Sequence, residues 1–258
     1  MNEAKNNPIG VIDSGVGGIS ALNALVRQLP EERFLYYGDT ANAPYGTKTM
    51  TEVLRLVHET VDHLMGKGIK ALVIACNTAT SAAAAPLRRE LTIPVIGMEP
   101  ALKPAAELRK DGSILVLATP LTLQQEKFMR LMEKYGEGTV KVPCTGLMEL
   151  VEKQDMAGAK LYLEKLFAGF DMDRADAVVL GCTHYVFLKD MIRAMIPAHV
   201  AITEGSDGTA RQLRRVLEKN DLLRTEGPGE VVFETSGTDA DLQTMKSFFQ
   251  PLQATLVK

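Results

Sequence analysis

The chain has 258 residues, of which 46% are hydrophobic and 24% charged, and its formal net charge is −3. This balance is typical of a globular protein and excludes the basic surface of a nucleic-acid-binding protein. No apolar run approaches the roughly 20 residues of a membrane span, and the N-terminus lacks the layout of a secretory signal. The 3 cysteines include no Cys-x-x-Cys pair, which disfavours a disulfide framework and a zinc site. We therefore expect a cytoplasmic protein that holds no metal and binds neither nucleic acid nor membrane.

Apolar strands alternate with amphipathic helices along the chain. In the first half we expect strands at residues 9–12, 33–37, 71–75 and 95–98, and helices at 19–28, at 51–67 and after residue 78. In the second half we expect strands at 114–118, 140–142 and 177–181, and helices at 122–135, near 147, at 157–167 and at 186–195. A connecting helix at 210–217 leads to a tail with a strand from residue 231 and a helix at 242–249. We expect this tail to return to the first sheet.

The two halves repeat one another at a constant offset of 106 residues. Under this offset, residues 10–13 fall on 116–119, residues 33–37 on 139–143, and residues 73–78 on 179–184. Strands that alternate with helices favour parallel sheets covered on both faces. The sequence thus predicts an α/β fold of two pseudo-symmetric three-layer domains with mostly parallel sheets and an active site in the cleft between them. We expect the first domain to comprise residues 1–97 and 210–258, and the second residues 98–209.

Each half carries a cysteine where a buried-looking strand gives way to a helix. These are Cys76 and Cys182. Open α/β sheets bind ligands at this end of their strands, and a helix start can lower the pKa of a thiol. His184 follows Cys182 by two residues, and Asp13 ends a neighbouring strand. Two equivalent thiols suit a nearly symmetric reaction, the inversion of a carbon centre by an acid and a base on opposite faces. The plain alternative is a pair of buried cysteines inherited by duplication.

Two further features have simpler interpretations. The glycine-rich segment at residues 13–18 lacks the Gly-Lys-Ser/Thr ending of a phosphate loop, so it is either a site for a compact anion or a plain tight turn. Cys144 has Gly38 as its counterpart under the offset, and we expect it to be structural.

Five spaced motifs lie at residues 10–18, 37–39, 44–46, 75–79 and 180–185. They resemble those of the glutamate racemases, in the aspartate/glutamate racemase family. The resemblance implies an isomerase that needs no cofactor and supplies D-glutamate for peptidoglycan. In such an enzyme Cys76 and Cys182 would remove and return the α-proton of glutamate on opposite faces. The resemblance also implies a homodimer.

The same resemblance implies roles for other side chains. Asp13 would assist one thiol, and Glu152 with His184 would assist the other, with Glu149 as a rival for the role of Glu152. The implied substrate contacts are Asp13, Ser14, Pro44, Tyr45, Gly46, Asn77, Thr78, Thr183 and His184, to which Thr119 and Thr122 could add contacts from the second half.

Three other functions stay open from the residues. An aspartate or related amino-acid racemase would share the two-cysteine plan. A two-lobed protein that only binds a small anion would not need the paired thiols. A thiol redox protein is disfavoured because no Cys-x-x-Cys pair is present.

Overall fold

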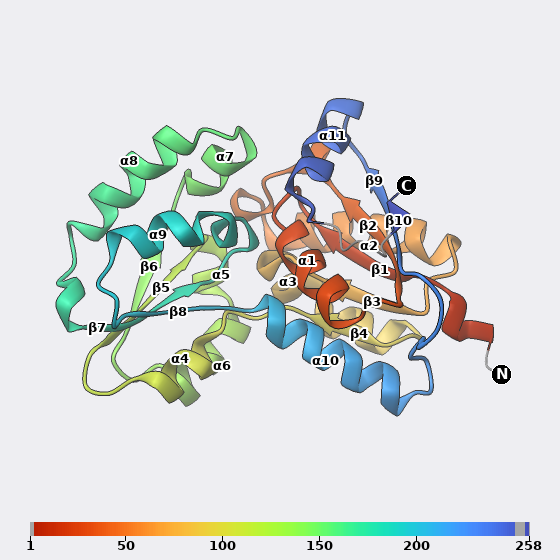
Figure 1. Cartoon of the computed structure of the whole chain (residues 1–258), viewed down its shortest axis with the longest axis horizontal. Helices are drawn as coiled ribbons and strands as arrows, with labels where there is room; N and C mark the ends of the chain where they lie inside the picture. The colour runs from red at the N-terminus through yellow and green to blue at the C-terminus, as the bar shows by residue number, and fades with distance from the viewer. Residues whose placement is uncertain (1–2, 251–255, 258) are drawn as a thin grey trace. The chain divides into compact units, whose positions relative to one another are not determined.

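The structure, a computed structural model, describes residues 3–250 and 256–257. The protein has an α/β fold, and its chain divides into two compact units (Figure 1). Unit 1 comprises Met1–Met98 and Ser206–Lys258, and unit 2 comprises Glu99–Gly205. Each unit has its own sheet, in which every described strand pair is parallel. No described helix is both long and apolar enough to cross a lipid bilayer.

Unit 1 is built on a six-stranded sheet with the strand order β10-β9-β2-β1-β3-β4. Its strands are β1 (Ile9–Asp13), β2 (Arg33–Gly38), β3 (Ala71–Ile74), β4 (Val95–Gly97), β9 (Glu230–Thr235) and β10 (Leu256–Val257). β1 is buried along its whole length, as expected of a central strand with both faces covered. The tail strand predicted from residue 231 is β9, which pairs with β2 in this sheet.

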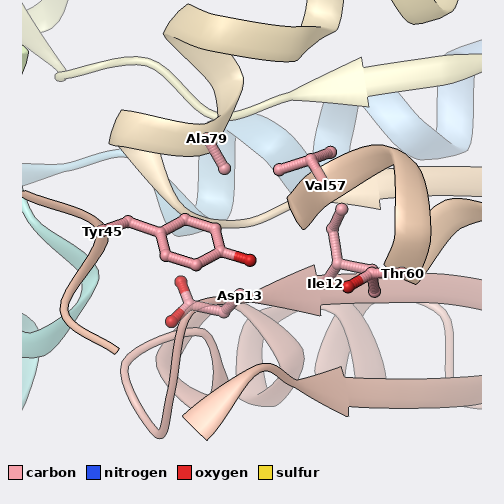
Figure 2. Close-up of a pocket in the computed structure, with 6 residues that line it drawn as sticks. All are labelled: Ile12, Asp13, Tyr45, Val57, Thr60 and Ala79. Carbon is pink, nitrogen blue, oxygen red and sulfur yellow. The ribbon is translucent and has the colours of Figure 1, made fainter. Parts of the chain in front are cut away.

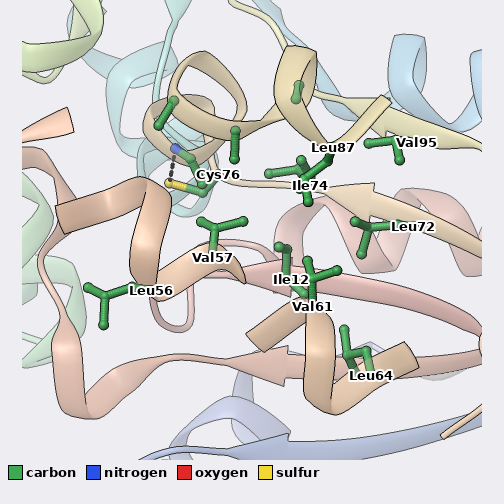
Figure 3. Close-up of a cluster of buried hydrophobic side chains, with 14 of the residues drawn as sticks. Ile12, Leu56, Val57, Val61, Leu64, Leu72, Ile74, Cys76, Leu87 and Val95 are labelled. Carbon is green, nitrogen blue, oxygen red and sulfur yellow. Dashed lines mark hydrogen bonds between the residues drawn. The ribbon is translucent and has the colours of Figure 1, made fainter. Parts of the chain in front are cut away.

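The helices of unit 1 are α1 (Ile19–Gln28), α2 (Met50–Gly66), α3 (Asn77–Glu90), α10 (Ser206–Lys219) and α11 (Asp239–Phe248), with short 3-10 helices η1 (Glu3–Asn6), η2 (Thr40–Asn42) and η3 (Tyr45–Thr47). A capping box starts α2, since Thr49 and Glu52 satisfy each other's backbone N–H groups. Figure 3 shows the core that α2 and α3 form with β1 and β3; it includes Ile12, Val57, Val61, Leu72, Ile74 and Leu87. Val11 points to the opposite face and is also fully buried, so both faces of β1 are packed.

Unit 2 has a four-stranded sheet with the order β6-β5-β7-β8. Its strands are β5 (Ser113–Ala118), β6 (Thr139–Pro143), β7 (Ala175–Leu180) and β8 (Ala201–Glu204). Its helices are α4 (Leu102–Leu108), α5 (Pro120–Gln124), α6 (Glu126–Tyr135), α7 (Leu147–Glu152), α8 (Met156–Phe167) and α9 (Lys189–Met195), with 3-10 helices η4 (Met172–Arg174) and η5 (Thr183–Leu188). Within this unit α4 and α6 cover one face of the sheet, and α7, α8 and α9 cover the other (Figure 1).

The two sheets share one topology. The order β2-β1-β3-β4 in unit 1 matches β6-β5-β7-β8 in unit 2. The segment that closes the first half also has a counterpart, since β4 begins at Val95 and β8 at Ala201, again 106 residues apart. A common strand order at one offset is what an internal duplication would produce.

Two predicted helices of unit 2 are broken in the structure. The helix expected at 122–135 is two helices, because Gln125 has an extended backbone with φ −72° and ψ 142°. α5 begins earlier than expected because the Thr119 side chain caps the N–H of Thr122 and Pro120 occupies the first turn. The helix expected at 186–195 begins as η5 and becomes α-helical only at Lys189. α4 and β8 are not among the elements predicted from the sequence.

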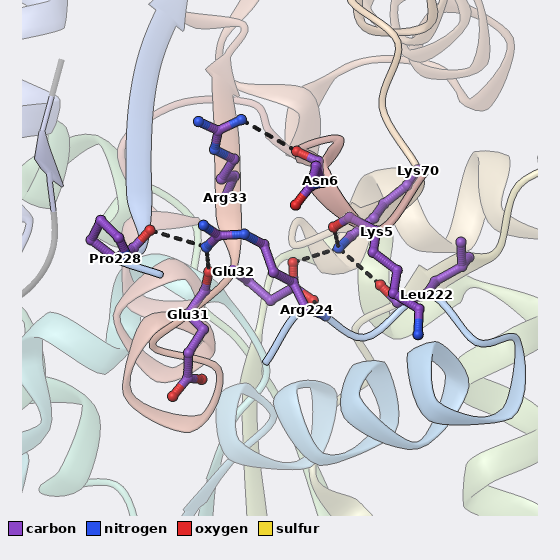
Figure 4. Close-up of polar contacts among 9 residues, drawn as sticks. All are labelled: Lys5, Asn6, Glu31, Glu32, Arg33, Lys70, Leu222, Arg224 and Pro228. Atoms are coloured by element: carbon purple, nitrogen blue, oxygen red, sulfur yellow. Dashed lines mark hydrogen bonds and ion pairs between the residues drawn. The ribbon is translucent and has the colours of Figure 1, made fainter. Parts of the chain in front are cut away.

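A buried ion pair lies where β2 and β3 begin (Figure 4). Lys70 Nζ and Glu32 Oε2 are 2.6 Å apart, and the two side chains are 1% and 0% exposed. The ammonium also donates to the carbonyls of Lys5 and Leu222, and Glu32 Oε1 accepts the N–H of Arg224. Burial lowers the pKa of Lys70, and the bond to Glu32 opposes this only in part. The pair therefore joins η1, two strands and the segment after α10.

Candidate active site

Cys76 lies at the carboxyl end of β3 and forms the N-cap of α3. Its Sγ accepts the N–H of Ala79 at 3.4 Å, and Ser14 Oγ lies 4.0 Å from the same sulfur. The thiol is buried, with 7% of the residue exposed. The positive end of a helix stabilises a negative charge at this position. The local fold thus directs a backbone N–H at the start of α3 to the Cys76 sulfur.

Asp13 ends β1, the strand next to β3. The N–H of Ala75 donates to the carbonyl of Ile12, which brings the two strand ends together. Asp13 is 2% exposed, and its Oδ1 accepts the N–H of Gly15 at 3.0 Å. A Cβ on Gly18 would lie only 2.5 Å from Asp13 Cβ, so this position needs glycine. The glycine-rich turn therefore holds a buried carboxyl group on the Cys76 side of the sheet.

The loop after β2 places Tyr45 beside Asp13. Its hydroxyl donates to Asp39 Oδ2 at 2.5 Å, and Asp39 Oδ1 accepts from Asn42 Nδ2 and Ser236 Oγ. Burial first and the Asp39 carboxylate second raise the pKa of Tyr45, so the phenol stays protonated. Figure 2 shows the ring over Asp13 in a small pocket whose other lining residues are Ile12, Val57, Thr60 and Ala79. No role for Asp39 or Ser236 follows from the sequence, because the hydrogen bond between them joins segments 197 residues apart.

Other predicted substrate contacts of unit 1 lie on the same elements. Asn77 and Thr78 open α3 and are 5% and 3% exposed. Asn77 Oδ1 is buried and has no hydrogen-bond partner within the described residues. Pro44 and Gly46 flank Tyr45 at the start of η3. A buried acceptor that lacks a donor is costly unless a ligand supplies one.

Cys182 follows β7 in unit 2 and is supported by side chains rather than by a helix start. Its Sγ lies 3.7 Å from His184 Nδ1, and His184 Nε2 lies 2.6 Å from Glu152 Oε1. The His184 side chain is 1% exposed and that of Glu152 is 23% exposed. Burial alone would lower the pKa of His184, but the bonds to Cys182 and Glu152 outweigh it and raise the pKa well above its usual value. The contacts with the thiol and the carboxylate therefore favour the protonated form of the imidazole.

Glu152 ends α7, on which Glu149 also lies. The sequence left both residues open as partners of His184, and in the structure Glu152 Oε1 is the oxygen that pairs with His184 Nε2. Thr119 and Thr122 stand at the carboxyl end of β5, where the hydroxyl of Thr119 donates to that of Thr122 at 2.9 Å. Thr183, 2% exposed, lies between Cys182 and His184. The predicted residues of the second half thus gather at the carboxyl ends of the strands of one sheet.

The sequence matches the family described as Asp/Glu/Hydantoin racemase over residues 9–213. The glutamate racemase of Clostridium acetobutylicum is 55% identical over 224 residues, which are 85% of this chain and 87% of the relative. The glutamate racemase of Clostridium botulinum (strain Loch Maree) is 47% identical over 242 residues, 92% of this chain and 94% of the relative. The chain belongs to the Asp/Glu/hydantoin racemase family.

Solved structures agree with this assignment. A glutamate racemase isoform from Bacillus anthracis has a TM-score of 0.85 at 31% identity, covering 98% of this chain and 97% of its own. Escherichia coli glutamate racemase, solved with L-glutamate and the activator UDP-MurNAc-ala, has a TM-score of 0.80 at 26% identity, covering 98% of each chain. The protein is therefore an amino-acid racemase, an isomerase.

The third cysteine of this racemase has a different environment. Cys144 is 2% exposed, its Sγ donates to the carbonyl of Val142, and its own carbonyl accepts the hydroxyl of Tyr185. Burial first and the nearby Cys182 second raise the pKa of Cys144 to about 12. The thiol therefore stays protonated.

Among the described residues, no His, Cys, Asp and Glu side chains are grouped to hold a metal ion.

Proposed function

We propose that the protein interconverts L- and D-glutamate by proton transfer at Cα, with Cys76 and Cys182 as the two acid/base groups and no cofactor. The observation that carries this proposal is that each unit holds a buried thiol at the carboxyl end of a parallel sheet, with a hydrogen-bonding group beside its sulfur: the N–H of Ala79 for Cys76 and His184 Nδ1 for Cys182. The names of the relatives support glutamate as the substrate. An aspartate racemase remains the alternative to test.

In the proposed reaction one thiolate removes the α-proton. The Cα–H bond breaks, an S–H bond forms, and the electron pair is delocalised into the substrate carboxylate. The second thiol then protonates the opposite face, so that its S–H bond breaks and a new Cα–H bond forms. The reverse reaction exchanges the two roles. Each turnover adds a proton to the first thiolate and removes one from the second thiol, so the enzyme ends with the second thiol deprotonated.

Groups beside each thiol would stabilise the charges in these steps. Asp13 and the α3 N-terminus would assist Cys76, and His184 with Glu152 would assist Cys182. Buried donors act strongly on developing charge because water does not screen them. The orphaned Asn77 Oδ1 fits an acceptor for the substrate ammonium. We assign the carboxylates of the substrate to hydroxyl and backbone donors, in the segments that contain Ser14, Tyr45, Gly46, Thr78, Thr119 and Thr183.

The biological role proposed is the supply of D-glutamate for peptidoglycan synthesis, by a homodimer in the cytoplasm. The three cysteines form no disulfide, which suits a reducing compartment. Light scattering of the purified protein tests the dimer. Rescue by exogenous D-glutamate of cells that lack the gene tests the role.

The activity is tested by circular dichroism of purified protein with D-glutamate, without added cofactor. We expect the optical signal to decay to that of the racemate, aspartate to react far more slowly, and Cys76→Ser or Cys182→Ser to lower the rate by orders of magnitude with the fold intact. A flat signal with both amino acids, or near wild-type turnover in either serine variant, would refute the proposal.

A further inference from the structure

Tyr36 lies in β2, the strand that pairs with β1, and its side chain contacts the turn that follows Asp13. Its side chain is fully buried, and its hydroxyl donates to the carbonyl of Gly15 at 2.6 Å. The N–H of Gly15 donates in turn to Asp13 Oδ1 at 3.0 Å. Gly15 thus accepts a hydrogen bond from the Tyr36 hydroxyl with its carbonyl and donates one to the Asp13 carboxyl group with its N–H.

The space around this hydroxyl is closely filled. A Cβ on Gly18 would lie 2.8 Å from the Tyr36 hydroxyl and 2.5 Å from Asp13 Cβ. The Tyr36 hydroxyl, the Asp13 side chain and the start of α1 therefore pack closely against one another. The Tyr36 ring lies 5.9 Å from the ring of Phe233 in β9, which lies 5.4 Å from that of Phe249. The segment after α10 therefore supports the ring that holds the turn.

We propose that Tyr36 is a positioning residue that acts through Gly15 to orient the carboxyl group of Asp13 toward the Cys76 thiol. This inference rests on the proposed role of Asp13 in assisting Cys76. Without the hydroxyl, the buried Gly15 carbonyl would lose a donor and the turn would relax. Small displacements of a group that assists proton transfer reduce the rate far more than they reduce substrate affinity.

The test compares Tyr36→Phe with Asp13→Asn by kinetics on D- and L-glutamate deuterated at Cα. For Tyr36→Phe we expect kcat to fall roughly ten- to a hundredfold and KM to change by less than about twofold. The primary isotope effect should rise for the enantiomer that Cys76 deprotonates and fall for the other, in the same sense as in Asp13→Asn. Tyr135→Phe is the matched control, since it removes a hydroxyl from the end of α6 in unit 2, away from the turn that carries Asp13, and should keep wild-type kinetics.

The outcomes separate this inference from the proposed function. Wild-type kcat and isotope effects in folded Tyr36→Phe, with Asp13→Asn impaired, would overturn the inference alone. A lowered Tm without a shift in isotope effects would overturn it as well, because a purely structural role would give that result. Wild-type behaviour of Asp13→Asn would instead refute the proposed role of Asp13. If Tyr36→Phe fails to fold, Phe233→Leu decides: a smaller shift in the same sense supports the inference, and unchanged isotope effects overturn it.

Discussion

Replacement of His184 by asparagine should impair one half of the proton transfer. Within the described residues, Cys182 Sγ has one side-chain hydrogen-bond partner, His184 Nδ1 at 3.7 Å, and the Glu152 carboxylate, 2.6 Å from His184 Nε2, favours the protonated imidazole. A hydrogen bond to a charged group contributes about 1.5–3 kcal/mol. Since about 1.36 kcal/mol corresponds to a tenfold change in rate, we expect kcat to fall on the order of 10- to 150-fold. KM should change little, because His184 supports the thiol more than it binds substrate.

The assay is the same measurement of kcat and primary isotope effects with both deuterated enantiomers. For His184→Asn we expect the isotope effect to rise for the enantiomer that Cys182 deprotonates, the opposite asymmetry to that of Asp13→Asn. His63→Asn is the matched control, because His63 Nε2 also contacts a carboxylate, that of Glu234 at 2.5 Å, but lies on the exposed side of α2. A folded His184→Asn with wild-type kcat and unchanged isotope effects would refute the assignment of His184 to Cys182.

Three further outcomes follow from the buried groups. Lys70→Met should lower the free energy of unfolding of unit 1 by about 3–5 kcal/mol, because the buried Glu32 carboxyl group loses its counter-ion. The double variant Glu32→Leu/Lys70→Met should recover most of that loss. Urea unfolding measures both free energies, and an equal loss in the single and the double variant would refute this prediction. The pKa of His184 is raised above its usual 6.5, so its ion pair should stabilise the fold fully below that pH and cease to do so as pH rises through the folded-state pKa. NMR of the imidazole nitrogens should show the cation at neutral pH and a lower pKa in Glu152→Gln; a neutral ring in the wild type would exclude the ion pair. Iodoacetamide near neutral pH should leave Cys144 unmodified in the native protein, because its pKa is about 12, and mass spectrometry of the alkylated peptides would expose any reaction there.

The repeat offset predicted much of the architecture. Strand and helix alternate along the chain as the apolar runs indicate, and the two thiols lie at equivalent positions of two like sheets. The offset would also have revealed β8 had it been applied to the segment after Val95. The break at Gln125 left no such signal, because a backbone torsion inside an otherwise helical pattern depends on tertiary packing rather than on local propensity.

The supporting groups of the two thiols were less accessible to sequence. The choice between Glu149 and Glu152 depends on which face of α7 meets His184, and only the structure fixes that rotation. Likewise, the two thiols have different neighbours: Cys76 lies at a helix start, and Cys182 lies beside an ion pair. The sequence does not show this difference, because the strands that precede the two thiols have similar sequences. Symmetric motifs therefore predicted the positions of the thiols but not their environments.

Early deuterium incorporation in D2O distinguishes two thiols that act on opposite faces of one substrate from a single acid/base group. Each thiol carries a single proton, so the group that removes the α-proton can return only that proton. We therefore expect product glutamate to carry deuterium at Cα while substrate recovered in the first turnovers remains protiated. Deuterium in the recovered substrate, or the original proton carried over into the product, would contradict a two-thiol mechanism.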